Sequence, residues 1–145
     1  MADTILARGW TIEVYDGTAY QSIGGINTFT LSSSVERSDG TTFDSEGNAE
    51  HTKSQLGKTI TVEGYYFEDD TGTRDAGQEA VETLCEALGS AAEETMHIAS
   101  PDGGYEVWMD GTFNLADIGG GNNDNTSWGF EFERTGATMS SDPNA

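Results

Sequence analysis

The chain has 145 residues with 26 acidic residues against six Lys and Arg, a formal net charge of −20. So acidic a surface repels nucleic acid and anionic membranes at low salt, and the length suits one domain with a single moderate core. Hydrophobic residues make up only 34%, a share that also fits disorder. They alternate with polar residues, however, in runs rich in aromatic and β-branched side chains, and this predicts half-buried strands.

The acidity is a property of the whole domain, because no Lys or Arg occurs between Arg74 and Arg134 while acids continue throughout. The single cysteine, Cys85, excludes an intrachain disulfide. The first ten residues lack an apolar signal core, and no run approaches the ~20 apolar residues of a membrane span. We therefore expect a soluble protein that is made in a cytoplasm and has no membrane partner.

The first half of the chain predicts strands followed by a long loop. Residues 10–15 and 20–23 alternate around the turn signal Asp16-Gly17 and predict a hairpin, and residues 26–31 predict a further strand. Residues 32–57 are rich in Ser, Thr, Gly and acids, so we predict a long irregular loop there. Loops of that length are usually functional or disordered.

The second half contains the strongest strand and the only predicted helix. Residues 58–67 alternate clearly, and residues 75–88 place Val81, Leu84, Cys85 and Leu88 on one helical stripe. Shorter strands are predicted at 95–99, 105–113 and 128–134, and residues 136–145 have little to pack. This order predicts a mainly β fold, an antiparallel β-sandwich or barrel with one flanking helix, because parallel winding would need several helices.

The sequence contains no recognisable catalytic site. His51 and His97 are isolated, no Ser lies in a G-x-S-x-G elbow, and Cys85 lies on the apolar helical stripe. We therefore predict no enzyme activity and no cofactor. Oxygen-rich segments at 44–48 and 122–124 leave a loop calcium site open as an alternative, although neither has the EF-hand spacing.

The segment TTFDSEGN at 41–48, followed by KTITVEGYY at 58–66 and then the helix, resembles the tail tube (major tail) proteins of long-tailed, non-contractile viruses of bacteria and archaea, the siphovirus type. The resemblance in element order covers roughly residues 10–134. It implies a single tail-tube-like domain over residues 1–145, with an N-terminal arm at 1–9, a long inter-ring loop at 32–57 and a C-terminal tail at 135–145.

The resemblance also implies a structural role. Subunits of this family form hexameric rings that stack into a hollow tube in the virion tail, through which DNA passes without specific binding. Partners would be further copies of the chain and other tail proteins such as the tape measure and terminator, with assembly in the host cytoplasm.

Candidate residues follow from that role. An acidic lumen keeps DNA from sticking, and the strand acids proposed to face it are Glu63, Glu106, Glu131 and Glu133. The candidate inter-ring contacts in and beside the long loop are Arg37, Asp39, Phe43, Asp44, Lys53, Leu56 and Lys58.

Two further hypotheses remain. The helix is also purely acidic on its outer face, so the charge indicates adaptation to high salt and a virus of a halophile; the alternative is an ordinary virus with an unusually acidic tube. The competing function is an Ig-like or carbohydrate-binding β-sandwich module, with or without calcium.

Overall fold

The computed structural model describes residues 4–39, 47–49 and 51–145. Its strands are β1 (Thr11–Tyr15), β2 (Tyr20–Ser22), β3 (Ile26–Asp39), β4 (His51–Tyr65), β5 (Glu94–Ala99), β6 (Glu106–Leu115) and β7 (Ser127–Arg134). Its helices are η1 (Ala7–Gly9), α1 (Ala76–Cys85) and η3 (Gly89–Ala92). The seven strands form one antiparallel sheet in the order β2-β1-β5-β6-β7-β4-β3. The predicted mainly β fold with one flanking α-helix is confirmed.

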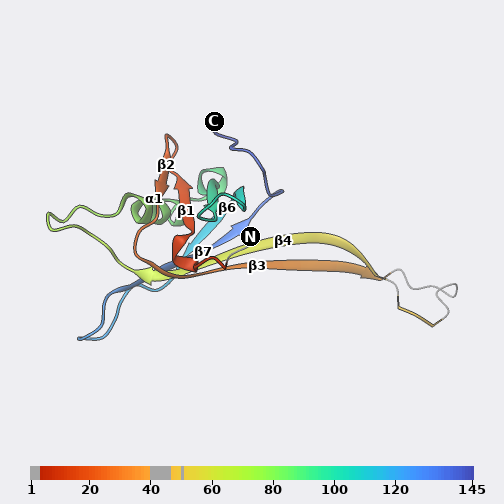
Figure 1. The fold of residues 1–145 in the computed structure, drawn as a ribbon, viewed down its shortest axis with the longest axis horizontal. Coiled ribbons are helices and arrows are strands. Elements are labelled where there is room, and N and C mark those ends of the chain that lie inside the picture. Colours follow the sequence, from red (N-terminus) through yellow and green to blue (C-terminus); the bar gives the residue numbers. More distant parts are fainter. Residues whose placement is uncertain (1–3, 40–46, 50) are drawn as a thin grey trace.

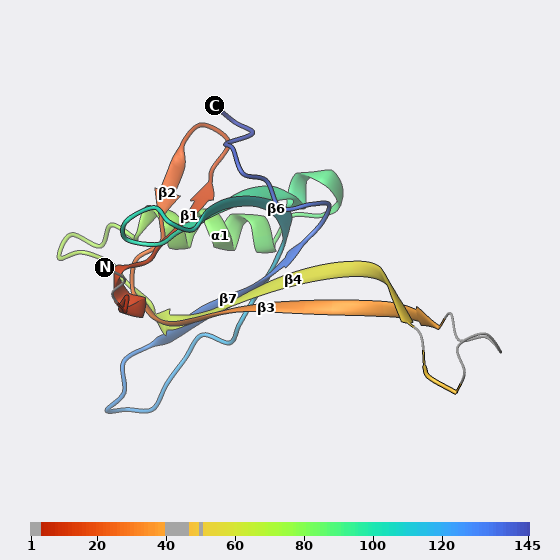
Figure 2. The same cartoon turned by 45° about the vertical axis from the view of Figure 1, so that its right-hand side comes forward.

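The sheet changes direction along β6. The first half of β6 pairs with β5 up to Gly111, and the second half pairs with β7 from Gly111 onward. A side chain at Gly111 would collide with the backbone carbonyl of Glu133, so this position requires glycine where the two parts of the sheet meet. In Figures 1 and 2, β1, β2 and α1 consequently lie on one side of the layer made by β3, β4 and β7.

Both parts of the sheet contribute to one hydrophobic core. Val14 on β1 and Met96 on β5 belong to the same buried cluster as Phe130 and Phe132 on β7, and Val81 joins this cluster from α1. All five side chains are buried. Burial of such side chains is the dominant favourable term in folding, so the bent sheet and the helix stabilise each other.

Helix α1 is shorter than predicted. It ends at Cys85 rather than near residue 88, and Leu88, expected on the apolar stripe, is 89% exposed beyond the helix. The N-terminus is as expected, because the Asp75 carboxylate accepts the backbone N–H of Gln78. The same carboxylate accepts the N–H of Gly24, so the cap also ties the helix to the connection between β2 and β3.

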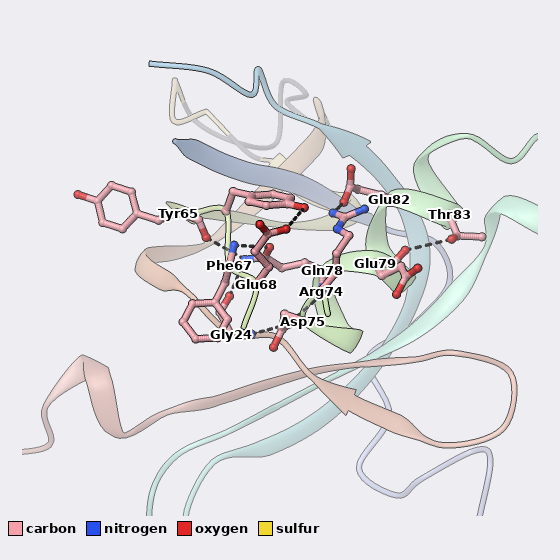
Figure 3. Close-up of polar contacts among 11 residues, drawn as sticks. Gly24, Tyr65, Phe67, Glu68, Arg74, Asp75, Gln78, Glu79, Glu82 and Thr83 are labelled. Carbon is pink, nitrogen blue, oxygen red and sulfur yellow. Dashed lines mark hydrogen bonds and ion pairs between the residues drawn. The ribbon is translucent and has the colours of Figure 1, made fainter. Parts of the chain in front are cut away.

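A buried glutamine fastens the helix to the end of β4. The Gln78 side chain donates to the carbonyl oxygens of Gly24 and Tyr65 at 2.9 and 2.8 Å and accepts the N–H of Phe67 at 3.1 Å. Figure 3 shows these bonds converging on one side chain. The amide thus satisfies three backbone groups that the end of a strand would otherwise leave unpaired.

The predicted loop at residues 32–57 is wrong over most of its length. Strands β3 and β4 pair from Ile26 to Asp39 on one side and from His51 to Gly64 on the other, with register shifts between Ile26 and Thr28 and between Glu36 and Arg37. We call residues 32–39 and 51–57 the hairpin arm; it projects beyond the rest of the fold in Figure 1. Its strands lie outside the core, so they lack the apolar alternation by which strands are recognised.

The C-terminal segment packs more than its sequence suggested. Met139 exchanges two backbone hydrogen bonds with Trp108, the Tyr20 hydroxyl donates to Asp142 at 2.7 Å, and the Asn144 amide donates to the Thr95 hydroxyl at 3.2 Å. Residues 135–145 therefore cover the side of β5 and β6 that faces away from the core.

Candidate functional site, a base-free polar face

Side chains alternate strictly along β4 and β7. Ile60 on β4 pairs with Phe132 on β7, and both are buried in the core. One residue further, Thr61 pairs with Glu131, and both lie on the opposite side of the sheet. The register therefore gives this layer one apolar face and one polar face.

The polar face continues across four strands. Cross-strand partners share a side of the sheet, so the pairings assign side chains from all four strands to this face. They are Thr28, Thr30, Ser32, Ser34 and Glu36 of β3; Gln55, Thr59, Thr61 and Glu63 of β4; Glu131 and Glu133 of β7; and Thr112 and Asn114 of β6. Every side chain in this set, which we call the polar face, is uncharged or acidic. Its acids are all exposed: Glu36, Glu63, Glu131 and Glu133.

The bases of the same strands lie on the other side of the sheet. Arg37 pairs with Lys53, and Lys58 pairs with Ser33, each in register with the core-facing positions. Arg134 follows Phe132 by two residues on β7, and its guanidinium donates to the Leu56 carbonyl oxygen at 3.1 Å. The carboxylates of Glu36, Glu63, Glu131 and Glu133 thus lie on the side of the sheet away from these cations, whereas Asp39 at the end of the arm lies on the same side as Arg37.

The structure brings three of the four candidate lumen acids together and leaves out the fourth. Glu63, Glu131 and Glu133 lie on neighbouring strands. Glu106 lies at the other end of β6, about 20 Å from Thr112 by the rise of a strand, where its carboxylate is 3.5 Å from His97 Nε2. His97 Nδ1 is 2.7 Å from a Glu13 carboxylate oxygen, and the ring stacks on Trp108. Glu106 therefore belongs to a cluster with His97 rather than to the polar face.

Sequence reasoning missed Glu36 on the polar face. Its position follows from its pairing with Gln55 inside the hairpin arm, and the sequence offered no signal for this because the arm was predicted to be a loop. Once the hairpin is known, the alternation Ser32, Ser34, Glu36 is enough to find it.

The candidate inter-ring residues mostly share the face opposite the polar face. Lys53 pairs with Arg37, Leu56 pairs with Val35, and Lys58 lies beside Ser33. Asp39 pairs with His51 on the same face at the end of the described arm. Phe43 and Asp44 lie outside the described residues.

The part of the chain that the structure describes offers little for catalysis. Within it, no group of three or more His, Cys, Asp or Glu side chains is arranged to hold a metal ion. Burial raises the pKa of the Cys85 thiol to about 11, which keeps it protonated and unreactive at neutral pH. In the first proposed calcium segment, residues 44–46 lie outside the described residues. In the second, the Asp124 carboxylate accepts the N–H of Gly121 within its own turn. No described helix is long and apolar enough to cross a membrane.

Comparison with known proteins identifies the fold. No family model and no curated protein matches the chain. Among solved structures, it is similar to a chain in the tail of an empty gene transfer agent particle with C6 symmetry (TM-score 0.70, 18% identity, 94% of this chain and 98% of that one). It is also similar to a chain of the native gene transfer agent virion (0.69, 19%, 94% and 98%).

A third similar structure is the SPP1 tail tube, with a TM-score of 0.65 and 12% identity over 94% of this chain and 78% of that one. At these identities the likeness establishes the fold alone. The resemblance inferred from the sequence is confirmed at that level: this chain has the fold of a tail tube protein.

Proposed function

We propose that this protein is a structural virion subunit whose copies form stacked, hexameric rings, and that these rings build the hollow tail tube of a siphovirus-type particle. The observation that carries the proposal is the separation of charge across the sheet. Glu63, Glu131 and Glu133 share a face with no base, while Arg37, Lys53, Lys58 and Arg134 lie on the opposite face. The similarity in fold to chains of assembled tails supports it.

The polar face suits the wall of a DNA conduit. Lys and Arg side chains bind phosphates and release counterions, which holds DNA in place. A wall of Ser, Thr, Asn and Glu side chains offers no cation to the phosphates, and its carboxylates repel them. DNA would then slide through the lumen without specific binding, and the protein would need no enzyme activity.

Two free strand edges support ring formation. Among the described strands, β3 pairs only with β4, and the half of β6 beyond Gly111 pairs only with β7. The layer β3-β4-β7-β6 therefore has one free edge on each side. Between residues 28 and 36, β3 has no Pro, Lys or register shift of the kind that normally protects an edge strand. Pairing of β3 with β6 of the next copy would close six layers into one barrel and leave no exposed edge.

The same proposal gives the location and the partners. The protein would reside in the virion tail after assembly in the host cytoplasm, in contact with further copies of itself and with tail proteins such as the tape measure and terminator. The −20 charge per subunit opposes such packing at low salt, so we propose that the virus infects a halophile, where a Debye length of about 3 Å at 1 M salt screens the repulsion.

Electron microscopy of the purified protein tests assembly. We expect stacked rings or tubes in molar salt at high protein concentration. A protein that stays strictly monomeric under these conditions, even with preformed tail tips as initiators, would contradict the proposal.

A charge reversal tests the lumen. We expect tubes of the triple variant Glu63→Lys, Glu131→Lys and Glu133→Lys to retain double-stranded DNA that is protected from nuclease and released by raised salt, whereas wild-type tubes retain none. The matched control, Glu79→Lys, Glu86→Lys and Glu93→Lys, changes three exposed acids outside the polar face by the same charge. DNA bound to control tubes should remain open to nuclease. Equal protection in both variants would place the polar face outside the lumen.

A further inference from the structure

The hairpin arm continues past the point where its neighbouring strand stops. The last pair between β4 and β7 joins Thr59 to Glu133, and from there β3 and β4 run on together to Asp39 and His51. Figures 1 and 2 show the arm extending beyond the end of β7. A two-stranded hairpin on its own is only marginally stable in water, so the direction of the arm depends on the contacts at its base.

The chain turns away from the arm directly after β7. Arg134 is the last residue of β7, and Gly136 adopts a φ of 78°, a left-handed conformation that favours glycine. Met139 then exchanges two backbone hydrogen bonds with Trp108 on β6. Among the described residues, β3 is therefore the only strand that pairs with β4 from Lys58 to the end of the arm.

The Arg134 side chain bonds to this part of β4. Its Nη2 donates to the Leu56 carbonyl oxygen at 3.1 Å, and its Nη1 donates to the Thr138 hydroxyl at 2.6 Å. Within the described part of the chain Arg134 forms no ion pair, although the sequence has 26 acidic residues. The planar guanidinium donates in two directions at once, so one side chain joins the end of β7 to the base of the arm and to the C-terminal segment.

The C-terminal segment is a fixed anchor for this contact. Directly after Thr138, Met139 is held by its two backbone hydrogen bonds to Trp108. Further along, the Asp142 carboxylate accepts the Tyr20 hydroxyl at 2.7 Å. A chain of hydrogen bonds therefore runs from β2 and β6, through the C-terminal segment and the guanidinium, to the backbone of the arm.

From these contacts we infer that Arg134 is a positioning residue, which sets the direction of the hairpin arm in the single subunit and couples that direction to the C-terminal segment. The arm is then oriented before a second copy binds. This role belongs to the isolated chain and does not depend on the proposed tube. If the tube forms, an arm that is already oriented loses less conformational entropy on assembly, which favours binding.

Electron–electron double resonance between two nitroxide labels measures the direction of the arm. The labels are placed at Gln55→Cys on the arm and Asn114→Cys on β6, both exposed on the polar face, in a Cys85→Ala background. With Arg134 present we expect one narrow distance distribution. Arg134→Met keeps an aliphatic stem but removes both donors, so the distribution should become at least about twice as wide. Arg134→Lys lacks the planar fork and should give an intermediate width.

A substitution in the C-terminal segment tests the coupling. Thr138→Val leaves the bond from Arg134 to the Leu56 carbonyl in place and removes only the link to the C-terminal segment, so it should also widen the distribution. Thr135→Val is the matched control, because the Thr135 side chain is exposed and its hydroxyl has no hydrogen bond in the described fold. The control should give the same distribution as the chain with the two labels alone.

The melting temperature of each variant separates a change in the arm from loss of the fold. A wide distribution with Arg134 intact would overturn the positioning role, and so would an unchanged distribution in Arg134→Met. An unchanged distribution in Thr138→Val would overturn the coupling to the C-terminal segment. Tube formation plays no part in this measurement, so failure of the wild-type protein to assemble would contradict only the proposed function.

Discussion

Successive residues of the β4–β7 strand pair alternate between two faces of the sheet, yet the two faces differ in burial and in charge. Phe130 and Phe132 are buried, while Glu131 between them is exposed on the polar face. The polar side carries Glu36, Glu63, Glu131 and Glu133 and no base, while Lys58 and Arg134 lie on the core side. The register of the sheet, rather than the overall charge, therefore decides where an acidic face without bases can form.

The largest expected difference between the two faces is in stability, and substitutions at neighbouring residues on β7 measure it. We expect Phe132→Ala to destabilise the protein by about 3–5 kcal/mol, since it leaves a cavity where Phe113 and Phe132 now pack. Glu133→Ala, one residue away on the exposed polar face, should change the free energy of unfolding by no more than about 0.5 kcal/mol. Urea unfolding of both variants checks this. Similar losses in the two variants would show that the polar face is packed rather than open.

The next largest effect on stability is expected at the buried amide of Gln78, on the side of the sheet that α1 covers. Gln78→Leu would leave the carbonyls of Gly24 and Tyr65 and the N–H of Phe67 without their partner, so we expect a loss of about 3 kcal/mol in unfolding free energy. Thr83→Ala is the control, because the Thr83 hydroxyl bonds only to the Glu79 carbonyl on the exposed side of the same helix. Thermal unfolding measures both variants. A loss of less than about 1 kcal/mol for Gln78→Leu would show that the Gln78 amide is not needed to pair these backbone groups.

Salt should stabilise the protein, because the body of the fold is acidic and half of the bases lie on the hairpin arm. We expect molar NaCl to raise the melting temperature by at least about 5 °C over low salt, equivalent to about 1–2 kcal/mol for a chain of this size. The double variant Glu79→Gln with Glu86→Gln, which removes two exposed charges from α1, should depend less on salt. Equal melting temperatures of the wild-type protein at both salt concentrations would contradict adaptation to brine.

The smallest effect concerns the C-terminal segment. Burial, followed by the hydrogen bond to Asp142, raises the pKa of Tyr20 to about 12 from an ordinary value near 10. The unfolded chain therefore loses this proton first, and the stability that Tyr20 contributes is present below pH 10 and lost as the pH rises toward 12. Ultraviolet titration of phenolate should show one late tyrosine that is missing in Tyr20→Phe, and that variant should lose about 1 kcal/mol at neutral pH. Identical titration curves would contradict the contact with Asp142.

Local sequence patterns were sufficient to predict the strands and the helix that bury one face. Residues 58–67 and 128–134 alternate so clearly that both strands and their core residues could be predicted. Helix α1 begins where the pattern over residues 75–88 predicted, because Asp75 is an N-cap residue whose carboxylate accepts the backbone N–H of Gln78. Glu63, Glu131 and Glu133 were found as candidates for the same reason, being the polar half of alternating strands.

The hairpin arm and the C-terminal cover could not be predicted in this way. Residues 32–39 have no buried face, so their strand form depends on pairing with residues 51–57. Met139 and Asp142 are held by Trp108 and Tyr20, residues far away in the chain. Contacts of this kind depend on distances in space and leave no period in the sequence.

Composition and alternation are properties of neighbouring residues, so the sequence alone was sufficient to predict an acidic, mainly β protein with one helix. The pairing of distant strands in the folded chain brings Glu36 together with Glu63, Glu131 and Glu133 on one face and places Glu106 beside His97 instead. These placements could not be predicted because a face of a sheet is assembled from strands in register, and the register is fixed by backbone hydrogen bonds between segments that are far apart in the sequence.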